Sequence, residues 1–122
     1  REASRKFAAS VPAELAGKYF ETGPNARYLA TVGKVLPAWR EQFRGAILAA
    51  DLVRVHTVSK EDNLLYWQLL HAFGDATGLP VLYNTSFNLF GEQMVCTPRD
   101  AVRSFYSSGV DAMVAGNFLL EK

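Results

Sequence analysis

The stretch "LVRVHTVSKEDNLLYWQLLHAFGDATGLPVLYN" (residues 52–84) decides the fold class. Its first seven residues alternate between the two sides of an extended segment, which predicts a strand over 52–58. The two sides are Leu52, Arg54, His56 and Val58 and, opposite them, Val53, Val55 and Thr57. The strand therefore places Arg54 and His56 side by side on one face.

A helix is predicted to follow this strand and to run to about Thr77. Ser59 is a suitable N-cap, and the acidic residues after it suit the positive end of the helix dipole. Gly78 is expected to end the helix, and Pro80 follows two positions later, as it commonly does after a helix stop. The spacing predicts that the helix buries an apolar stripe made of Leu65, Leu69, Ala72, Phe73 and Ala76.

The remaining segments predict shorter elements. Residues 80–84 read as a buried strand, and Thr97 followed by Pro98 is typical of a helix start, which predicts a helix over 98–108. The first twenty residues predict a loop and then a short helix, with Pro12 in its first turn. Further elements are strands in 27–35, 111–116 and 118–122 and a brief helical segment at 37–43. Strands that alternate with helices indicate an α/β domain with some parallel pairing.

Composition excludes several classes of protein. The chain has 122 residues, of which 49% are hydrophobic and 20% charged, as in a globular domain and not a disordered one. A net charge of +1 gives no electrostatic reason to expect a nucleic-acid or membrane partner. Cys96 is the single cysteine, so we expect a packed thiol and a reducing, cytoplasmic location. Residue 1 is Arg, and we expect the chain to be part of a longer polypeptide.

Polar residues follow the second strand directly, in the run Asn84-Thr85-Ser86-Phe87-Asn88. In α/β sheets, ligands bind beyond the carboxyl ends of strands, and Asn and Ser side chains supply donors and acceptors for phosphate or carbonyl groups. The alternative is a turn in which these side chains bond their own backbone, and the residues alone favour it slightly. Arg54 suits a phosphate, although a solvated sheet face is its simpler explanation. His56 and His71 have no partners at metal-binding spacing, so no metal site is predicted.

A longer pattern leads to a family resemblance. The run "TGLPVLYNTSFNLFGEQMVCTPRDAVRSFYSSGVDAMVAGNFLLEK" (77–122) is similar to the C-terminal end of the NodU/CmcH-type O-carbamoyltransferases, which act on nodulation factors and antibiotics. "RVHTVSKEDN" (54–63) and "REASRKFAASV" (1–11) also resemble motifs of that family. The family departs from this chain at a few places, since it has Pro at positions 6, 9 and 93 and Gln at position 56.

The resemblance implies a fold and a site. The fold would be a YrdC-like twisted mixed sheet flanked by helices, with 1–122 an incomplete C-terminal domain whose actin-like N-terminal partner domain is absent. Ser86 and Asn88 match the second half of the K-x-R…S-x-N signature, and Asn84 lies beside them. These three would hold the phosphate and carbamoyl oxygens, while Arg5 and Arg54 would neutralise phosphate charge. Arg5, Arg54 and Ser86 are thus the expected catalytic residues.

The resemblance also implies a two-stage reaction. This portion would use carbamoyl phosphate and ATP, with Mg²⁺, to form carbamoyladenylate. The actin-like domain, with Fe²⁺ or a similar metal, would pass the carbamoyl group to an acceptor hydroxyl. Two alternatives stay open: a degenerate nucleotide- or anion-binding domain without catalysis, and a threonylcarbamoyl-adenylate synthase-like protein of tRNA modification. A homodimer is also left open.

Overall fold

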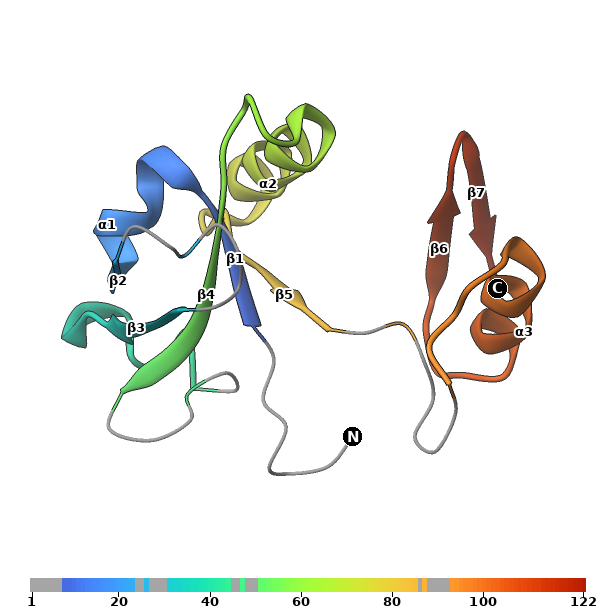
Figure 1. The fold of residues 1–122 in the computed structure, drawn as a ribbon, viewed down its shortest axis with the longest axis horizontal. Coiled ribbons are helices and arrows are strands. Elements are labelled where there is room, and N and C mark those ends of the chain that lie inside the picture. The colour runs from blue at the N-terminus through green and yellow to red at the C-terminus, as the bar shows by residue number, and fades with distance from the viewer. Residues whose placement is uncertain are drawn as a thin grey trace. The chain divides into compact units, whose positions relative to one another are not determined.

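The structure is a computed structural model that describes residues 8–23, 26, 31–44, 47, 51–85, 87 and 93–122. These residues belong to two compact units, and the chain passes from one to the other after Thr85 (Figure 1). Each unit is described by itself below.

The first unit is built on a mixed five-stranded sheet with the order β2-β3-β4-β1-β5. The strands are β1 (Ala8–Pro12), β2 (Phe20–Glu21), β3 (Thr31–Val35), β4 (Leu52–Val58) and β5 (Leu82–Asn84). β1 and β4 pair in parallel, and the other neighbouring strands pair antiparallel. The predicted α/β class, the strand over 52–58 and the presence of parallel pairing are confirmed.

β1 is the element that the sequence analysis missed. We predicted a loop and a helix there, with Pro12 in the helix, but Pro12 is the last residue of a strand whose five residues are all buried. Ala8, Ala9 and Ser10 have little intrinsic preference for a strand. Two strands flank β1 and both of its faces are covered, so tertiary pairing and burial decide its conformation. The short helices η1 (Ala13–Leu15) and α1 (Ala16–Tyr19) follow directly.

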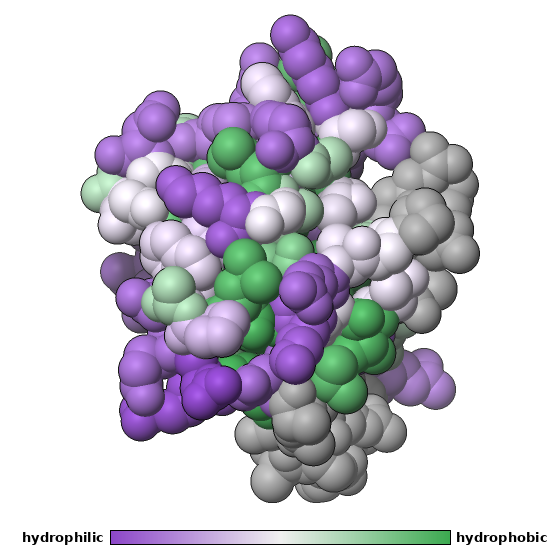
Figure 2. All heavy atoms as spheres, turned by 90° about the vertical axis from the view of Figure 1, so that its left-hand side faces the viewer, coloured by the Kyte–Doolittle hydropathy of each residue, from purple (hydrophilic) through white to green (hydrophobic). Residues whose placement is uncertain are grey.

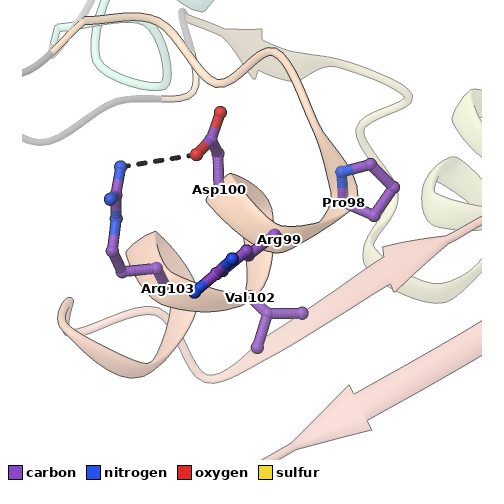
Figure 3. Close-up of a pocket in the computed structure, with 5 residues that line it drawn as sticks. All are labelled: Pro98, Arg99, Asp100, Val102 and Arg103. Atoms are coloured by element: carbon purple, nitrogen blue, oxygen red, sulfur yellow. Dashed lines mark hydrogen bonds and ion pairs between the residues drawn. The ribbon is translucent and has the colours of Figure 1, made fainter.

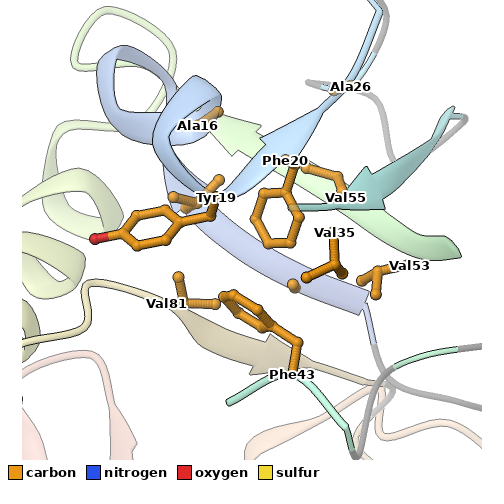
Figure 4. Close-up of a cluster of buried hydrophobic side chains, with 11 residues drawn as sticks. Ala16, Tyr19, Phe20, Ala26, Val35, Phe43, Val53, Val55 and Val81 are labelled. Carbon is orange, nitrogen blue, oxygen red and sulfur yellow. The ribbon is translucent and has the colours of Figure 1, made fainter. Parts of the chain in front are cut away.

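One face of the sheet carries the hydrophobic core (Figure 4). Val53 and Val55 of β4 are fully buried on this face, together with Ala9 and Val11 of β1. The aromatic rings of this cluster pack closely, with the Phe20 and Phe43 centroids 4.8 Å apart. The buried members of the cluster are Ala9, Val11, Ala16, Tyr19, Phe20, Ala26, Val35, Phe43, Val53, Val55 and Val81. Phe43 lies in the turns that follow the short helix η3 (Pro37–Trp39), where a helical segment was predicted.

The helix α2 (Leu64–Thr77) lies beside β1 (Figure 1). Its N-cap is Asn63, whose Oδ1 accepts a hydrogen bond from Tyr66 N at 3.1 Å. The predicted cap at Ser59 is therefore wrong: its Oγ accepts from Asp62 N and closes a turn before the helix. Gly78 ends the helix with φ of 84°, as predicted.

The predicted buried stripe of α2 is wrong, because the helix packs through another side. Leu65 is 80% exposed and Leu69 is 55% exposed, whereas Leu70 is fully buried. Gly74 allows the close approach on the packed side, since a Cβ there would lie 2.6 Å from the Cβ of Pro80. Periodicity found an apolar stripe but could not show which of two sides the sheet would cover.

A carboxylate from the first unit's short helix η1 also fixes the packed side of α2. The Trp67 indole donates from Nε1 to Glu14 Oε1 at 2.9 Å, and His71 Nε2 lies 2.7 Å from the same oxygen. Burial raises the pKa of Glu14, but bonds from its own backbone N–H, His71 and Trp67 outweigh burial and hold it below its ordinary value of 4.5. Glu14 is thus an ionised link between η1 and α2 at neutral pH.

The second unit contains the helix α3 (Pro98–Tyr106) and an antiparallel hairpin of β6 (Ala112–Ala115) and β7 (Phe118–Glu121). Thr97 caps α3 by accepting a hydrogen bond from Asp100 N at 3.1 Å, as the sequence predicts. Phe105 is fully buried. Cys96 is exposed, so the prediction of a packed thiol is wrong: its neighbours here do not enclose it.

No helix within the described ranges combines the length and apolarity that a membrane crossing needs. From the side of the molecule drawn in Figure 2, hydrophobic residues form separate patches between hydrophilic ones. This face resembles an ordinary water-exposed protein surface.

Candidate functional site

The sheet brings two predicted site residues onto one row. Ala8 of β1 is the Cα partner of Arg54 in β4 and also of Asn84 in β5. Directly paired residues project to the same side of a sheet. Arg54 and Asn84 therefore share one face, with Ala8 between them. Two strand spacings separate their Cα atoms, or about 10 Å.

Ala8 has the smallest side chain of the three residues in this row. Its side chain is a single methyl group and is 3% exposed. Arg54 is exposed and Asn84 is half-buried, so a guanidinium and an amide flank the buried Ala8. No carboxylate among the described residues forms an ion pair with Arg54. The arrangement suits an anion that one fork-shaped cation and one amide can bind together.

A second polar row lies next to the first on the same face. Ser10 of β1 is the Cα partner of His56 in β4, and its Oγ lies 3.2 Å from His56 Nδ1. Ser10 is fully buried, and the His56 ring lies 6.2 Å from the ring of Tyr66 in α2. Burial lowers the pKa of His56 below its ordinary value of 6.5, so the imidazole is neutral at neutral pH. The second row is a neutral polar layer that α2 partly covers.

Sequence reasoning did not single out Ser10. The residue lies in the "REASRKFAASV" motif, but the strand that pairs it with His56 was not predicted. The motif was the one signal that pointed to this position. The prediction that Arg54 and His56 share a face of β4 is consistent with the pairing, because both pair with even-numbered residues of β1.

Three predicted site residues, Arg5, Ser86 and Asn88, lie outside the described residues. Their roles stay predictions. Of the five predicted ligands, the structure places Arg54 and Asn84, and it brings these two onto one row.

Two hollows beside α3 in the second unit contain none of the predicted site residues. Pro98, Arg99, Asp100, Val102 and Arg103 line the first (Figure 3). Arg103 Nη2 lies 3.5 Å from Asp100 Oδ1, so the Asp100 carboxylate partly offsets the charge of the Arg103 guanidinium. The second hollow also includes Asp100 and Arg103.

Metal-binding side chains do not gather in the part of the chain that the structure describes. There, no group of three His, Cys, Asp or Glu side chains is placed to hold a metal ion.

Comparison with known proteins shows a match over the whole chain. The family model described as "Carbamoyltransferase C-terminus" matches residues 1–122. The chain is 40% identical to the uncharacterized protein sll1178 of Synechocystis sp., over 100% of this chain and 23% of that protein. It is 38% identical to nodulation protein NolNO of Sinorhizobium fredii, over 100% of this chain and 18% of that protein. It is 35% identical to nodulation protein NolO of Bradyrhizobium diazoefficiens, over 100% of this chain and 23% of that protein. The chain spans about a fifth of the length of these relatives.

Proposed function

The chain belongs to the carbamoyltransferase C-terminal family, and on that premise we propose that it is the adenylate-forming part of an ATP-dependent O-carbamoyltransferase. The observation that carries this proposal is the row in which Arg54 and Asn84 share one face of the sheet beside Ala8. The proposal covers this portion of the polypeptide, and the transfer step belongs to the remainder of the longer protein.

The proposed chemistry balances as two displacements. Water and carbamoyl phosphate give carbamate and inorganic phosphate. An oxygen of carbamate then attacks the α-phosphorus of ATP, the bond to the bridging oxygen breaks, and pyrophosphate leaves as carbamoyladenylate forms. Neither step needs a protein nucleophile. The first step needs carbamoyl phosphate held with a water molecule, and the second needs two anions held in line. Both need cations and hydrogen bonds where negative charge develops.

Arg54 and Asn84 suit this task. The guanidinium of Arg54 donates two parallel hydrogen bonds to phosphate oxygens and offsets their charge. The amide of Asn84 both donates and accepts, so it can bind a phosphate oxygen or the carbamoyl group. The neutral His56 in the next row adds no charge that would compete with Arg54 for the anion.

The resemblance supplies the other proposed ligands. Ser86 and Asn88 follow Asn84 by two and four positions in the chain, and Arg5 precedes β1. We assign Arg5 to phosphate charge, and Ser86 and Asn88 to phosphate and carbamoyl oxygens. Mg²⁺ enters this proposal as part of the substrate, bound to the phosphates of ATP.

The acceptor is a hydroxyl compound bound by the remainder of the polypeptide. Two of the relatives are nodulation proteins by name, which is compatible with an acceptor of the nodulation-factor kind. The resemblance assigns the actin-like domain to the transfer step. We accordingly propose that the 122-residue portion alone forms no carbamoylated product.

The test is pyrophosphate release by the complete natural polypeptide, supplied with ATP, Mg²⁺ and carbamoyl phosphate. Arg54→Ala should lower kcat/KM for carbamoyl phosphate at least tenfold, because the main anchor of the anion is lost. Arg44→Ala is the matched control, since Arg44 is a highly exposed arginine with one long contact to Glu41, and its variant should keep wild-type kinetics. Wild-type kinetics in Arg54→Ala would remove the Arg54 row from the reaction. Nucleotide binding without any pyrophosphate release would favour a degenerate domain instead.

A further inference from the structure

His56 is half-buried on the face of the sheet that carries Arg54, and one of its two ring nitrogens is already engaged. Its Nδ1 lies 3.2 Å from the hydroxyl oxygen of Ser10, which is a hydrogen-bond distance. Among the described residues, no other side chain forms a hydrogen bond or an ion pair with the ring. The second ring nitrogen, Nε2, is therefore the atom that His56 can offer to a ligand.

Coverage of this face decreases along β4 toward Arg54. Val58 is buried, His56 is half-buried and Arg54 is exposed. Ser10 is fully buried beside His56, and the ring of Tyr66 in α2 lies 6.2 Å from the imidazole ring. His56 thus lies at the border where the covered part of the face meets the part that carries Arg54.

The distance between Arg54 and His56 suits a shared ligand. These residues are two positions apart on β4 and project to the same face. Two residues along a strand span about 7 Å, which is less than the about 10 Å between the Cα atoms of Arg54 and Asn84 across the sheet. A ligand large enough to contact both Arg54 and Asn84 therefore also spans the distance from Arg54 to His56.

Ser10 can determine which ring nitrogen of His56 carries the proton. Burial lowers the pKa of His56, so the ring is neutral at neutral pH and carries one proton. When the Ser10 hydroxyl donates to Nδ1, the ring proton is on Nε2, and Nε2–H can donate to a ligand. In the other tautomer Nε2 has a lone pair, which repels the oxygen of an anion. An anionic ligand therefore favours the Nε2–H tautomer, and the Ser10 hydroxyl stabilises it because a hydroxyl donates as well as accepts.

We propose that His56 is a further binding residue for carbamoyl phosphate, in which Ser10 holds Nδ1 and Nε2–H donates a hydrogen bond to a phosphate oxygen. This inference rests on the proposed function, because it concerns the same anion that Arg54 and Asn84 are proposed to bind. Ser10 does not touch the ligand and acts through His56 as a positioning residue. Since the His56 donor is neutral, it directs the bound phosphate without adding a second positive charge beside Arg54.

Pyrophosphate release by the complete natural polypeptide tests the contact, with carbamoyl phosphate varied at saturating ATP. His56→Ala should lower kcat/KM for carbamoyl phosphate about tenfold, because a hydrogen bond to a charged group is lost. His56→Gln keeps a side-chain N–H and can bond Ser10, so it should stay within about threefold of wild type. The KM for ATP should not change in either variant. Thr57→Val is the matched control, since Thr57 is half-buried on the same strand but pairs with Val11 on the core face, and it should keep wild-type kinetics.

Ser10→Ala tests the positioning role. It removes the hydroxyl at Nδ1 and should lower kcat/KM for carbamoyl phosphate about threefold, since His56 keeps its ring but loses the group that fixes it. In the His56→Ala background the same change should have no further effect, because Ser10 acts only through His56. Equal losses in the two backgrounds would overturn the positioning role, because Ser10 would then act on the sheet and not on the imidazole.

The ¹⁵N NMR shifts of the His56 ring report its tautomer in the wild-type chain. With ¹⁵N-labelled histidine, the His56 signals are those that are absent from His56→Gln. Addition of carbamoyl phosphate should give Nε2 the shift of a protonated nitrogen and Nδ1 the shift of an unprotonated one. A protonated Nδ1 in the carbamoyl phosphate complex would overturn the proposal, and this result stands whether or not His56→Ala folds.

Comparison with Arg54→Ala separates this inference from the proposed function. Wild-type kinetics in His56→Ala, together with a loss in Arg54→Ala, would overturn the role of His56 and leave the proposed function in place. Wild-type kinetics in both variants would overturn both. A loss in His56→Ala that His56→Gln does not rescue, or one that affects the KM for ATP alone, would also contradict the contact.

Discussion

Consecutive residues of β4 lie in opposite surroundings, and the contrast extends across the whole sheet. Val53 and Val55 are fully buried against aromatic rings, whereas Arg54 between them is exposed. On β1, Ala9 belongs to the core, while Ala8 and Ser10 belong to the two polar rows. The core face stabilises the first unit, and the opposite face supplies the residues proposed to bind substrate. Changes on the two faces should therefore separate loss of stability from loss of activity.

The largest effect on stability is expected at the core face. Phe43 is fully buried, with its ring centroid 4.8 Å from that of Phe20 and 6.1 Å from that of Tyr19. Phe43→Ala should lower the free energy of unfolding by about 3–5 kcal/mol, because it removes a buried ring and leaves a cavity. Urea unfolding measures the change. Phe118→Ala is the control, since Phe118 is 76% exposed, and its effect should stay within about 0.5 kcal/mol. Equal effects for the two variants would contradict the assigned core.

A smaller effect is expected where β3 packs against β4. A Cβ on Gly33 would lie 2.8 Å from Cγ2 of Val55 and 3.1 Å from the carbonyl oxygen of Glu21. Gly33→Ala should therefore destabilise the first unit by about 1–3 kcal/mol through overpacking.

Gly17→Ala should raise the free energy of unfolding, in contrast to Gly33→Ala. Nothing lies within 4 Å of a Cβ at Gly17, and this residue is helical, so alanine should stabilise by about 0.4–1 kcal/mol. Thermal melts of the two variants compare them directly. A Gly33→Ala variant as stable as Gly17→Ala would show that the sheet face is less tightly packed than described.

The link between Glu14 and α2 should contribute about 1 kcal/mol, since Glu14 is partly exposed and solvent weakens its bonds. The pKa of Glu14 is lowered in the folded state, so this contribution is present above its unfolded value of about 4.5 and is lost as pH falls through the folded pKa. Glu14→Gln should unfold at lower urea concentration than wild type at pH 7, and this difference should shrink as the pH falls below about 4.5 and through the lowered folded pKa. If the difference in stability between Glu14→Gln and wild type grew as the pH fell, the direction of the Glu14 pKa shift would be contradicted.

The smallest effect concerns His56. Burial lowers its pKa, so the unfolded chain binds a proton more readily than the folded chain does. Stability should fall as pH drops from about 6.5 to the folded pKa of this group. His56→Gln can still hydrogen-bond Ser10 but cannot take up the proton. The melting temperature of this variant should therefore depend less on pH over this range. An unchanged slope in the variant would assign the pH dependence to another group.

Local patterns explain which parts of the fold were predictable. The alternation of β4, the Gly78 stop of α2 and the Thr97-Pro98 start of α3 each depend on a few neighbouring residues, and all three are confirmed. β1 was missed because its small residues become a strand only through pairing with β4 and β5. The packed side of α2 was predicted wrongly because it is set by contacts with residues outside the helix, Glu14 and Pro80.

The candidate site divides in the same way. Arg54 and Asn84 were identified from motif resemblance and side-chain chemistry, but only the pairing of both with Ala8 brings them onto one row. No short stretch of sequence shows which residues of the three strands are paired, because the pairing depends on β1, a strand that was not predicted. Ser10 was missed for the same reason.

The central claim is that Arg54 and Asn84 bind one and the same ligand, and a double-mutant cycle tests it most directly. The measured quantity is kcat/KM for carbamoyl phosphate, from pyrophosphate release by wild type, Arg54→Ala, Asn84→Ala and the double variant. If both side chains hold one anion, the loss in the double variant should differ from the sum of the single losses by more than about 0.5 kcal/mol. Strictly additive losses, or single variants with wild-type kinetics, would contradict the claim.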